Sequence, residues 1–176
     1  MPMIDLFMPE GALEPDARAE AVERLTQALL RHEGAPQDNR YVEAMAWTLV
    51  HEMPREAFNV AGRPADRPFY RVMVTVPEGT LLQGPGLIGT QARKNLVREV
   101  TEILLEAEGT EYSDVESGRV YCLIQEIEDG YWGGVGSTFR MADIVATAAP
   151  EAPQTELSGR AREAIDGLLS ISPPAA

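Results

Sequence analysis

The sequence contains one six-residue motif twice, as Met8-Pro9-Glu10-Gly11-Ala12-Leu13 and again as Val76-Pro77-Glu78-Gly79-Thr80-Leu81. Each copy ends a stretch of alternating apolar residues that is typical of a β-strand, at residues 3–8 and 71–76. Because Pro and Gly end strands and form turns, both copies predict a turn that leaves a strand. Their order and similarity indicate an internal duplication.

The same elements are expected after each copy of the motif. An apolar stripe at helical spacing predicts helices over residues 15–34 and 92–108, and apolar runs predict second strands over 45–53 and 120–127. Two parallel strands need a crossover connection, so each copy predicts a β-α-β unit whose strands lie side by side under the helix. Matching aromatic and glycine-containing segments, 57–62 and 131–136, follow in both copies.

We therefore predict an α+β fold in which tandem β-α-β units form a four-stranded mixed sheet with two helices on one face, plus hairpins and a C-terminal helix. The expected units are residues 1–66, 67–145 and a C-terminal extension, 146–176, with an amphipathic pattern over 157–169. That helix is expected to dock on the body or on a neighbouring subunit, or to recruit a partner. The insertion at 82–92 lacks the spacing of a phosphate-binding loop, which favours a lid or a longer connection.

Composition and charge exclude several classes of function. The chain has 176 residues with 15 Lys+Arg, of which Lys94 is the one lysine, against 28 Asp+Glu, for a net charge of −13. This balance argues against nucleic-acid and membrane-surface binding. The single cysteine, Cys122, excludes an internal disulfide, and no His/Cys spacing suggests a metal or cofactor site. With no basic signal region and no apolar run long enough for a membrane helix, a cytoplasmic location is expected.

Pro2 is the candidate catalytic residue. The initiator methionine is normally removed before a small second residue, which would leave the secondary amine of Pro2 at the chain end. Since the predicted core strand begins here, the amine would be held at a fixed position. An α-amino group titrates near about 8, and apolar surroundings or a nearby cation would move its pKa toward about 7, where a general base works best.

These residues resemble the tautomerase superfamily, the group of 4-oxalocrotonate tautomerase and malonate semialdehyde decarboxylase, and in particular its fused two-unit members. The resemblance covers roughly residues 2–140 and is carried by Pro2, the turn at 8–11, and the segments 51–54 and 57–62. It implies a tautomerase/MIF-like fold and a homotrimer, with an active site lined partly by a neighbouring subunit.

The resemblance also implies three alternatives for function. The first is an isomerase in which Pro2 is the general base for keto–enol tautomerisation of a small carbonyl compound or carboxylic acid. The second uses protonated Pro2 as an acid in hydration, dehalogenation or decarboxylation of a three-carbon acid. The third is a non-catalytic ligand-binding or scaffold protein, because a β-α-β-β-α-β body also serves ligand-binding modules.

The arginines that grip substrate carboxylates in small tautomerases are replaced here. The position after the first Glu-Gly is Ala12, and its counterpart in the second copy is Thr80. The arginine early in the second strand corresponds to Trp47, with Tyr121 in the repeat. The usual carboxylate clamps are therefore missing, and no single family activity can be carried over.

Other residues are candidates for binding the substrate. Arg40, just before the second strand, is the candidate replacement cation, with a solvated loop arginine as the alternative. Phe58 matches the family's active-site aromatic or packs in its hairpin, and Arg71, one residue after the repeat equivalent of Pro2, reaches the same site or is an exposed strand residue. Three further aromatic residues are expected either to line a pocket or to pack in the core: Trp47, Tyr121 and Trp132.

Overall fold

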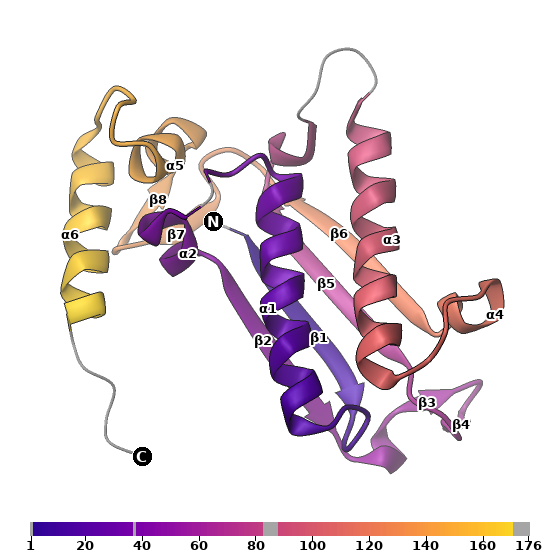
Figure 1. The fold of residues 1–176 in the computed structure, drawn as a ribbon. Coiled ribbons are helices and arrows are strands. Elements are labelled where there is room, and N and C mark those ends of the chain that lie inside the picture. The colour runs from indigo at the N-terminus through magenta and orange to yellow at the C-terminus, as the bar shows by residue number, and fades with distance from the viewer. Residues whose placement is uncertain (1, 37, 83–87, 171–176) are drawn as a thin grey trace.

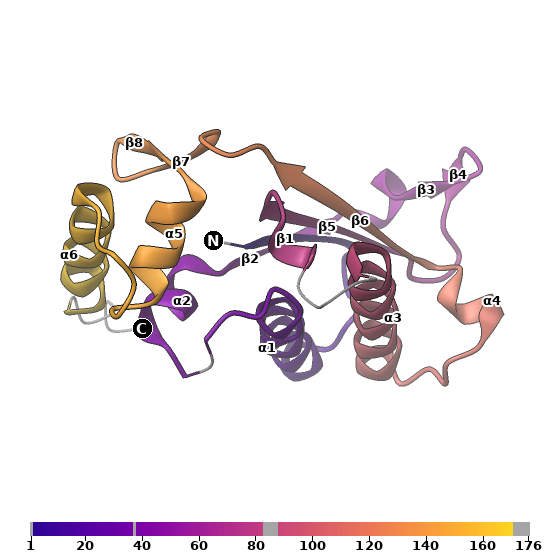
Figure 2. The ribbon, with the colours of Figure 1, turned by 90° about the horizontal axis from the view of Figure 1, so that it is seen from above.

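The computed structural model describes residues 2–36, 38–82 and 88–170. Of the predicted insertion at 82–92, residues 83–87 lie outside the described residues. The body is a sheet of four strands: β1 (Met3–Pro9), β2 (Trp47–Met53), β5 (Tyr70–Pro77) and β6 (Val120–Ile127). Two long helices, α1 (Pro15–His32) and α3 (Ile88–Glu108), lie side by side against one face of it (Figures 1 and 2). This is the predicted α+β architecture.

The strand order is β2-β1-β5-β6. Strands β1 and β2 are parallel, β5 and β6 are parallel, and the two pairs meet antiparallel between β1 and β5. The predicted β-α-β units and the mixed sheet are thus confirmed. Because β1 and β5 run in opposite directions, Met3 pairs with Thr75, and the end of β5 lies beside the beginning of β1.

The core lies between the sheet and the two helices. Alternate residues of β1 (Ile4, Leu6, Met8) are buried there, as the alternating pattern requires. They pack in one apolar cluster with residues of both helices, among them Leu25 of α1 and Leu104 of α3. Each such side chain contributes about 1.5–3 kcal/mol when fully buried. The other face of the sheet presents exposed apolar side chains: Trp47, Leu49, Tyr121 and Leu123.

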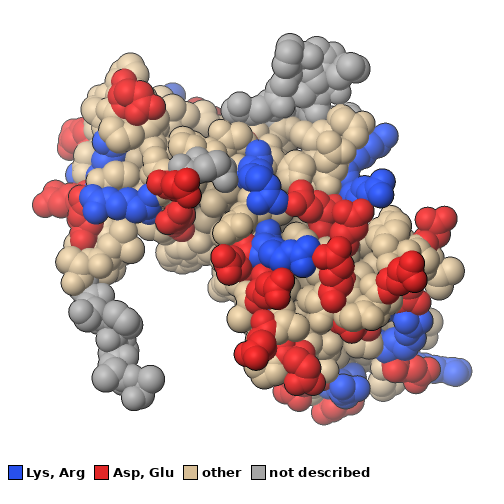
Figure 3. Space-filling view, viewed as in Figure 1, with Lys and Arg blue, Asp and Glu red and all other residues tan. Residues whose placement is uncertain are grey.

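Charged side chains cross between the two helices on the outer surface. Arg24 of α1 pairs with Glu106 of α3 at 2.5 Å, and Arg31 pairs with Glu99 at 2.5 Å. Figure 3 shows acidic and basic side chains close together over these helices. Since such exposed pairs contribute about 0–1 kcal/mol each, the apolar layer beneath them holds the helices to the sheet.

Short elements complete the chain between and after the strands. The predicted hairpins are present as β3 with β4 and β7 with β8. The short elements are η1 (Arg55–Ala57), β3 (Asn59–Val60), β4 (Arg63–Pro64), η2 (Thr80–Leu82), α4 (Asp114–Ser117), β7 (Trp132–Gly134) and β8 (Ser137–Phe139).

Two helices differ from the expectation. Residues 40–45 form α2 (Arg40–Met45) instead of a loop and the start of a strand. The side chain of Asn39 caps this helix by accepting the backbone N–H groups of Tyr41 at 3.0 Å and Val42 at 3.3 Å. Helix α5 (Met141–Ala148) was not expected, and the predicted boundary between residues 145 and 146 falls inside it.

The C-terminal part docks on the body at the end of the sheet where β1 begins (Figure 1). Helix α6 (Glu156–Ser170), close to the predicted 157–169, packs with α5 around Phe139, Ile144 and Ala161. Asn39 donates a hydrogen bond from Nδ2 to the carbonyl of Ala148 at 2.7 Å, which joins α5 to α2. Within the described ranges, no helix is long and apolar enough to span a membrane.

Candidate functional site

Pro2 is buried at the first position before strand β1. Its carbonyl accepts the backbone N–H of Trp47 at 3.1 Å, so the residue is tied to the neighbouring strand β2. The next residue, Met3, is already in register with both β2 and β5. The sheet therefore fixes Pro2 in place, as the sequence predicted.

A cavity of about 250 Å³ adjoins Pro2, and we call it the Pro2 pocket. Its walls come from the C-terminal end of α1, from α2, from the turn after β5 and from α5. Most of the side chains that line it are apolar, among them Leu30, Val42, Met45 and Ile144. Helix α5 thus covers a pocket that the β-α-β units alone would leave more open.

Glu33 lines the Pro2 pocket and is only 7% exposed. It is the C-terminal cap of α1, and its backbone N–H donates to the carbonyl of Leu29 at 3.0 Å. Burial raises the pKa of its carboxyl group, and the positive charge of the chain's N-terminus and, to a smaller degree, the nearby Thr80 hydroxyl offset part of that rise. The negative end of the helix dipole also disfavours a carboxylate at this position.

Sequence reasoning missed Glu33. The signal that could have found it is its position, because an acid that follows Arg31 and His32 at the C-terminal end of a helix opposes the helix dipole. A residue in such an unfavourable place is a candidate for a functional role.

Thr80 reaches the Pro2 pocket from the second unit. The antiparallel pairing of β1 with β5 brings the turn after Pro77 to the beginning of β1. The hydroxyl of Thr80 donates to the carbonyl of Pro77 at 3.0 Å. Thr80 occupies the position where the family resemblance places an arginine, and among the described residues no lysine or arginine lines this pocket.

Arg40 does not line the Pro2 pocket. Its guanidinium pairs with Asp166 of α6 at 2.6 Å and donates to the hydroxyl of Tyr41 at 2.9 Å. The side chain is 59% exposed, and its pKa is raised by the hydrogen bond with Tyr41 and by the charge of Asp166. The structure therefore uses Arg40 to hold α6 against α2.

Three other candidates lie at the opposite end of the sheet from Pro2. Arg71 pairs in register with Phe7 and stands over its ring at 5.0 Å, and Tyr121 pairs with Arg71 from β6. Phe58 follows η1, beyond the last residue of β2. Within one chain, none of these three is brought to the Pro2 pocket.

Trp47 and Trp132 do line a cavity together. It measures about 300 Å³ and lies next to the Pro2 pocket, with Met45 in the walls of both. Its other walls come mainly from apolar residues of the β7–β8 hairpin and α6. The expected aromatic pocket is therefore present for two of the three residues, and Tyr121 is not part of it.

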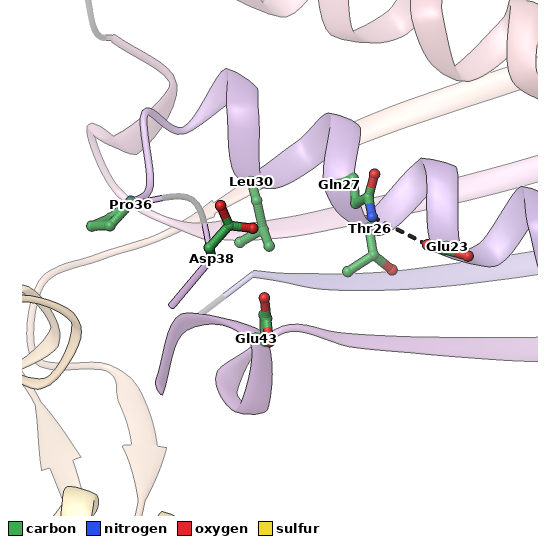
Figure 4. Close-up of a pocket in the computed structure, with 7 residues that line it drawn as sticks. All are labelled: Glu23, Thr26, Gln27, Leu30, Pro36, Asp38 and Glu43. Atoms are coloured by element: carbon green, nitrogen blue, oxygen red, sulfur yellow. Dashed lines mark hydrogen bonds between the residues drawn. The ribbon is translucent and has the colours of Figure 1, made fainter. Parts of the chain in front are cut away.

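A third hollow, of about 360 Å³, lies between α1 and the segment that leads to α2 (Figure 4). Figure 4 shows Glu23, Asp38 and Glu43 around it, with Leu30 beside Asp38 and Gln27 donating to Glu23. Among the described residues, no group of three or more His, Cys, Asp or Glu side chains is placed to hold a metal ion. This hollow is polar and does not contain Pro2.

No family model and no curated protein matches the sequence. Solved structures with a similar fold include Pt0534 inactivated by 2-oxo-3-pentynoate, with a TM-score of 0.61 at 18% identity over 81% of this chain and 98% of that one. R7 fused 4-OT, a wild-type asymmetric trimer, has a TM-score of 0.55 at 19% identity over 77% and 94%. A macrophage migration inhibitory factor-like protein from Entamoeba histolytica has a TM-score of 0.55 at 15% identity over 78% and 98%.

The likeness in each case spans more than three quarters of this chain and nearly the whole of the other chain. It confirms, at the level of the fold, the resemblance on which the sequence analysis relied. The chain has the fold of the tautomerase superfamily, in the arrangement of its fused two-unit members.

Proposed function

We propose that the protein is a tautomerase-type enzyme in which Pro2, freed by removal of Met1, is the general base for keto–enol tautomerisation of a small carbonyl compound. The observation that carries this proposal is the position of Pro2, buried at the start of a core strand and facing a cavity of about 250 Å³. An amine in such apolar surroundings has a lowered pKa and is free to accept a proton near neutral pH.

Glu33 bears on the alternative chemistry. Hydration, dehalogenation or decarboxylation by a protonated Pro2 needs a partner that activates water, and Glu33 is an acid in the same pocket. Burial raises the pKa of Glu33, which favours its uncharged form, and an uncharged carboxyl group cannot take a proton from water. Tautomerisation with Pro2 as the base is therefore preferred over hydration, dehalogenation or decarboxylation with Pro2 as the acid. The non-catalytic alternative is distinguished by the experiment below.

We also propose that three copies of the chain assemble through the uncovered face of the sheet. This face carries exposed apolar side chains, among them Trp47, Leu49 and Leu123, and contact of such apolar surface with water is unfavourable. The similar fused 4-OT described above is a trimer. In such an assembly Phe58, Arg71 and Tyr121 would be available to a neighbouring subunit. Replacing Leu49 and Leu123 by glutamate is expected to give monomers in light scattering, and a wild-type monomer would contradict the proposal.

The test of the function begins with the mass of the purified protein, which should lack Met1. Proton NMR in D2O would then follow exchange of the α-protons of phenylpyruvate and of its uncharged methyl ester. Wild type should exchange at least one of them, and Pro2→Ala should lose about 10²–10⁴-fold of the rate. Retained Met1, or equal rates for wild type and Pro2→Ala, would refute the role of Pro2.

A further inference from the structure

We infer that the Pro2 pocket takes an uncharged, largely apolar carbonyl compound with an acidic α-proton, and that the carboxyl group of Glu33 donates a hydrogen bond and then a proton to its oxygen. This inference rests on the proposed function of Pro2. It goes further by naming the class of substrate and a second catalytic residue.

The lining of the pocket is the first argument. A carboxylate moved from water into a small cavity must be paired with a cation or with several donors, or it costs several kcal/mol. Among the described residues, the polar side chains that line the Pro2 pocket are those of Glu33 and Thr80, and the rest of the wall is dominated by apolar groups. Such a wall suits an uncharged molecule.

The arginine of helix α2 is already engaged. Arg40 lies on α2, a helix that forms part of the wall, but it does not line the pocket, and its guanidinium is held by Asp166 of α6 at 2.6 Å. The chain as a whole carries a net charge of −13, which also repels anions at long range. Neither Arg40 nor the net charge of the chain therefore favours a carboxylate substrate.

Glu33 supplies the donor that an uncharged carbonyl oxygen needs. It is buried on the cavity wall with Thr80 beside it, and its surroundings favour the protonated carboxyl group, which can donate. Among the described residues, no salt bridge pairs Glu33 with a lysine or an arginine. Glu99 and Glu106 of α3, in contrast, each pair with an arginine of α1.

The chemistry balances with these two groups alone. Pro2 nitrogen takes the α-proton as the C–H bond breaks, a C=C bond forms, and the carbonyl π-pair moves to oxygen. That oxygen takes the proton of Glu33, which becomes a carboxylate. After the enol leaves, water carries the proton from the Pro2 ammonium back to Glu33, so the net change is an isomerisation without any cofactor.

The substrate class is tested with two alkynones of nearly equal size, 2-oxo-3-pentynoate, which is an anion, and 3-pentyn-2-one, which is uncharged. The lone pair of Pro2 nitrogen adds to the alkyne, and the nitrogen proton ends on the adjacent carbon, so the N-terminal peptide gains the mass of one probe. Rates with the wild-type protein are divided by the rates with prolinamide in solution. Burial raises the pKa of the Cys122 thiol to about 12, and peptide mapping separates any reaction there.

We expect the normalised rate to favour 3-pentyn-2-one by at least about tenfold, because the anion loses its hydration without finding a cation. Equal rates, or a preference for 2-oxo-3-pentynoate, would overturn the substrate class while leaving Pro2 as the reactive amine. No labelling by either probe would instead refute the proposed function itself. The comparison uses the wild-type chain and so does not depend on the folding of a variant.

The role of Glu33 is tested with Glu33→Gln, which keeps the size and a donor but cannot transfer a proton. Exchange of the α-proton of methyl phenylpyruvate should fall by about 10²-fold or more, while labelling by 3-pentyn-2-one stays within about twofold. Glu43→Gln, in the neighbouring polar hollow, is the matched control and should leave both rates unchanged. Exchange by Glu33→Gln at the wild-type rate would overturn the role of Glu33.

Discussion

The two ends of the sheet are built from corresponding parts of the duplicated chain. At one end, Pro2 directly precedes β1 and Glu33 caps the C-terminus of α1; at the other, Tyr70 begins β5 and Glu108 ends α3. Each glutamate directly precedes the glycine that follows its helix, Gly34 or Gly109, and both glycines have a positive φ, 69° and 77°. The same local signals therefore produced both ends.

What surrounds the two glutamates differs. Arg119, only 4% exposed, pairs with Glu108 at 2.9 Å and with Glu116 at 2.7 Å, and the hydroxyl of Tyr70 donates to Glu108 at 3.3 Å. Glu33 instead lines a cavity with Pro2. After the duplication, one end of the sheet is therefore occupied by a buried network of charged side chains, and the other end holds a pocket. Within its described residues, each chain thus has one pocket of the Pro2 type.

The largest effect is expected from Arg119→Met. The substitution leaves Glu108 and Glu116 without their buried partner and also removes a hydrogen bond to the carbonyl of Pro68. Removing one member of a buried ion pair costs about 3–5 kcal/mol of the free energy of unfolding, measured by urea denaturation. Arg98→Met, which removes an exposed pair with Glu102, is the control and should remain close to wild type. Equal stability of the two variants would break the comparison.

The architecture of the sheet and its helices can be predicted from the sequence because it depends on local sequence patterns. Alternation in residues 3–8 and 71–76, the Pro-Glu-Gly turns and the apolar stripes of both helices are all short-range patterns, and the duplication repeated each of them. Pro2 was likewise found from its place at the start of a strand. Helix α2 was missed since a single side chain, Asn39, caps a helix of six residues.

The rest of the site depends on pairings between distant parts of the chain. Arg40 was expected near Pro2, but Asp166, far away in sequence, holds it at α6. Thr80 and Glu33 meet only because β5 runs antiparallel to β1, and α5 covers them through contacts that its own pattern does not specify. The repeat aligns Arg71 with the site, whereas the antiparallel pairing of β5 with β1 places it at the other end. The family resemblance aligns Phe58 with the site, but Phe58 follows the end of β2, which runs parallel to β1 and away from Pro2.

A smaller effect, with the opposite sign at the two ends, is expected for the glutamates. Because burial raises the pKa of Glu33 above its ordinary value of 4.5, the folded chain binds this proton more tightly than the unfolded chain. The stability that this provides is complete below the unfolded pKa and is lost as the pH rises through the folded pKa. At pH 7, Glu33→Gln should therefore be more stable than wild type by about 1 kcal/mol.

Urea denaturation between pH 4 and pH 8 measures this difference, and the advantage of Glu33→Gln should grow with pH. Glu108→Gln is the matched variant at the other end and should be less stable than wild type, since Arg119 loses a charged partner. Destabilisation of both variants at neutral pH would show that the two glutamates have the same structural role.

The smallest effect is expected for Tyr70→Phe. Burial raises the pKa of the Tyr70 hydroxyl well above its usual range, so it remains a donor to Glu108 at every pH of interest. Its loss should cost about 0.5 kcal/mol, at the low end for a hydrogen bond, because Arg119 still satisfies the carboxylate. Since Tyr70 occupies the position of Pro2 in the second unit, the rate of proton exchange is the sharper readout: it should stay at the wild-type value. A fall in that rate without a fall in stability would mean that the network at this end takes part in the chemistry, and the two ends would then be two halves of one function.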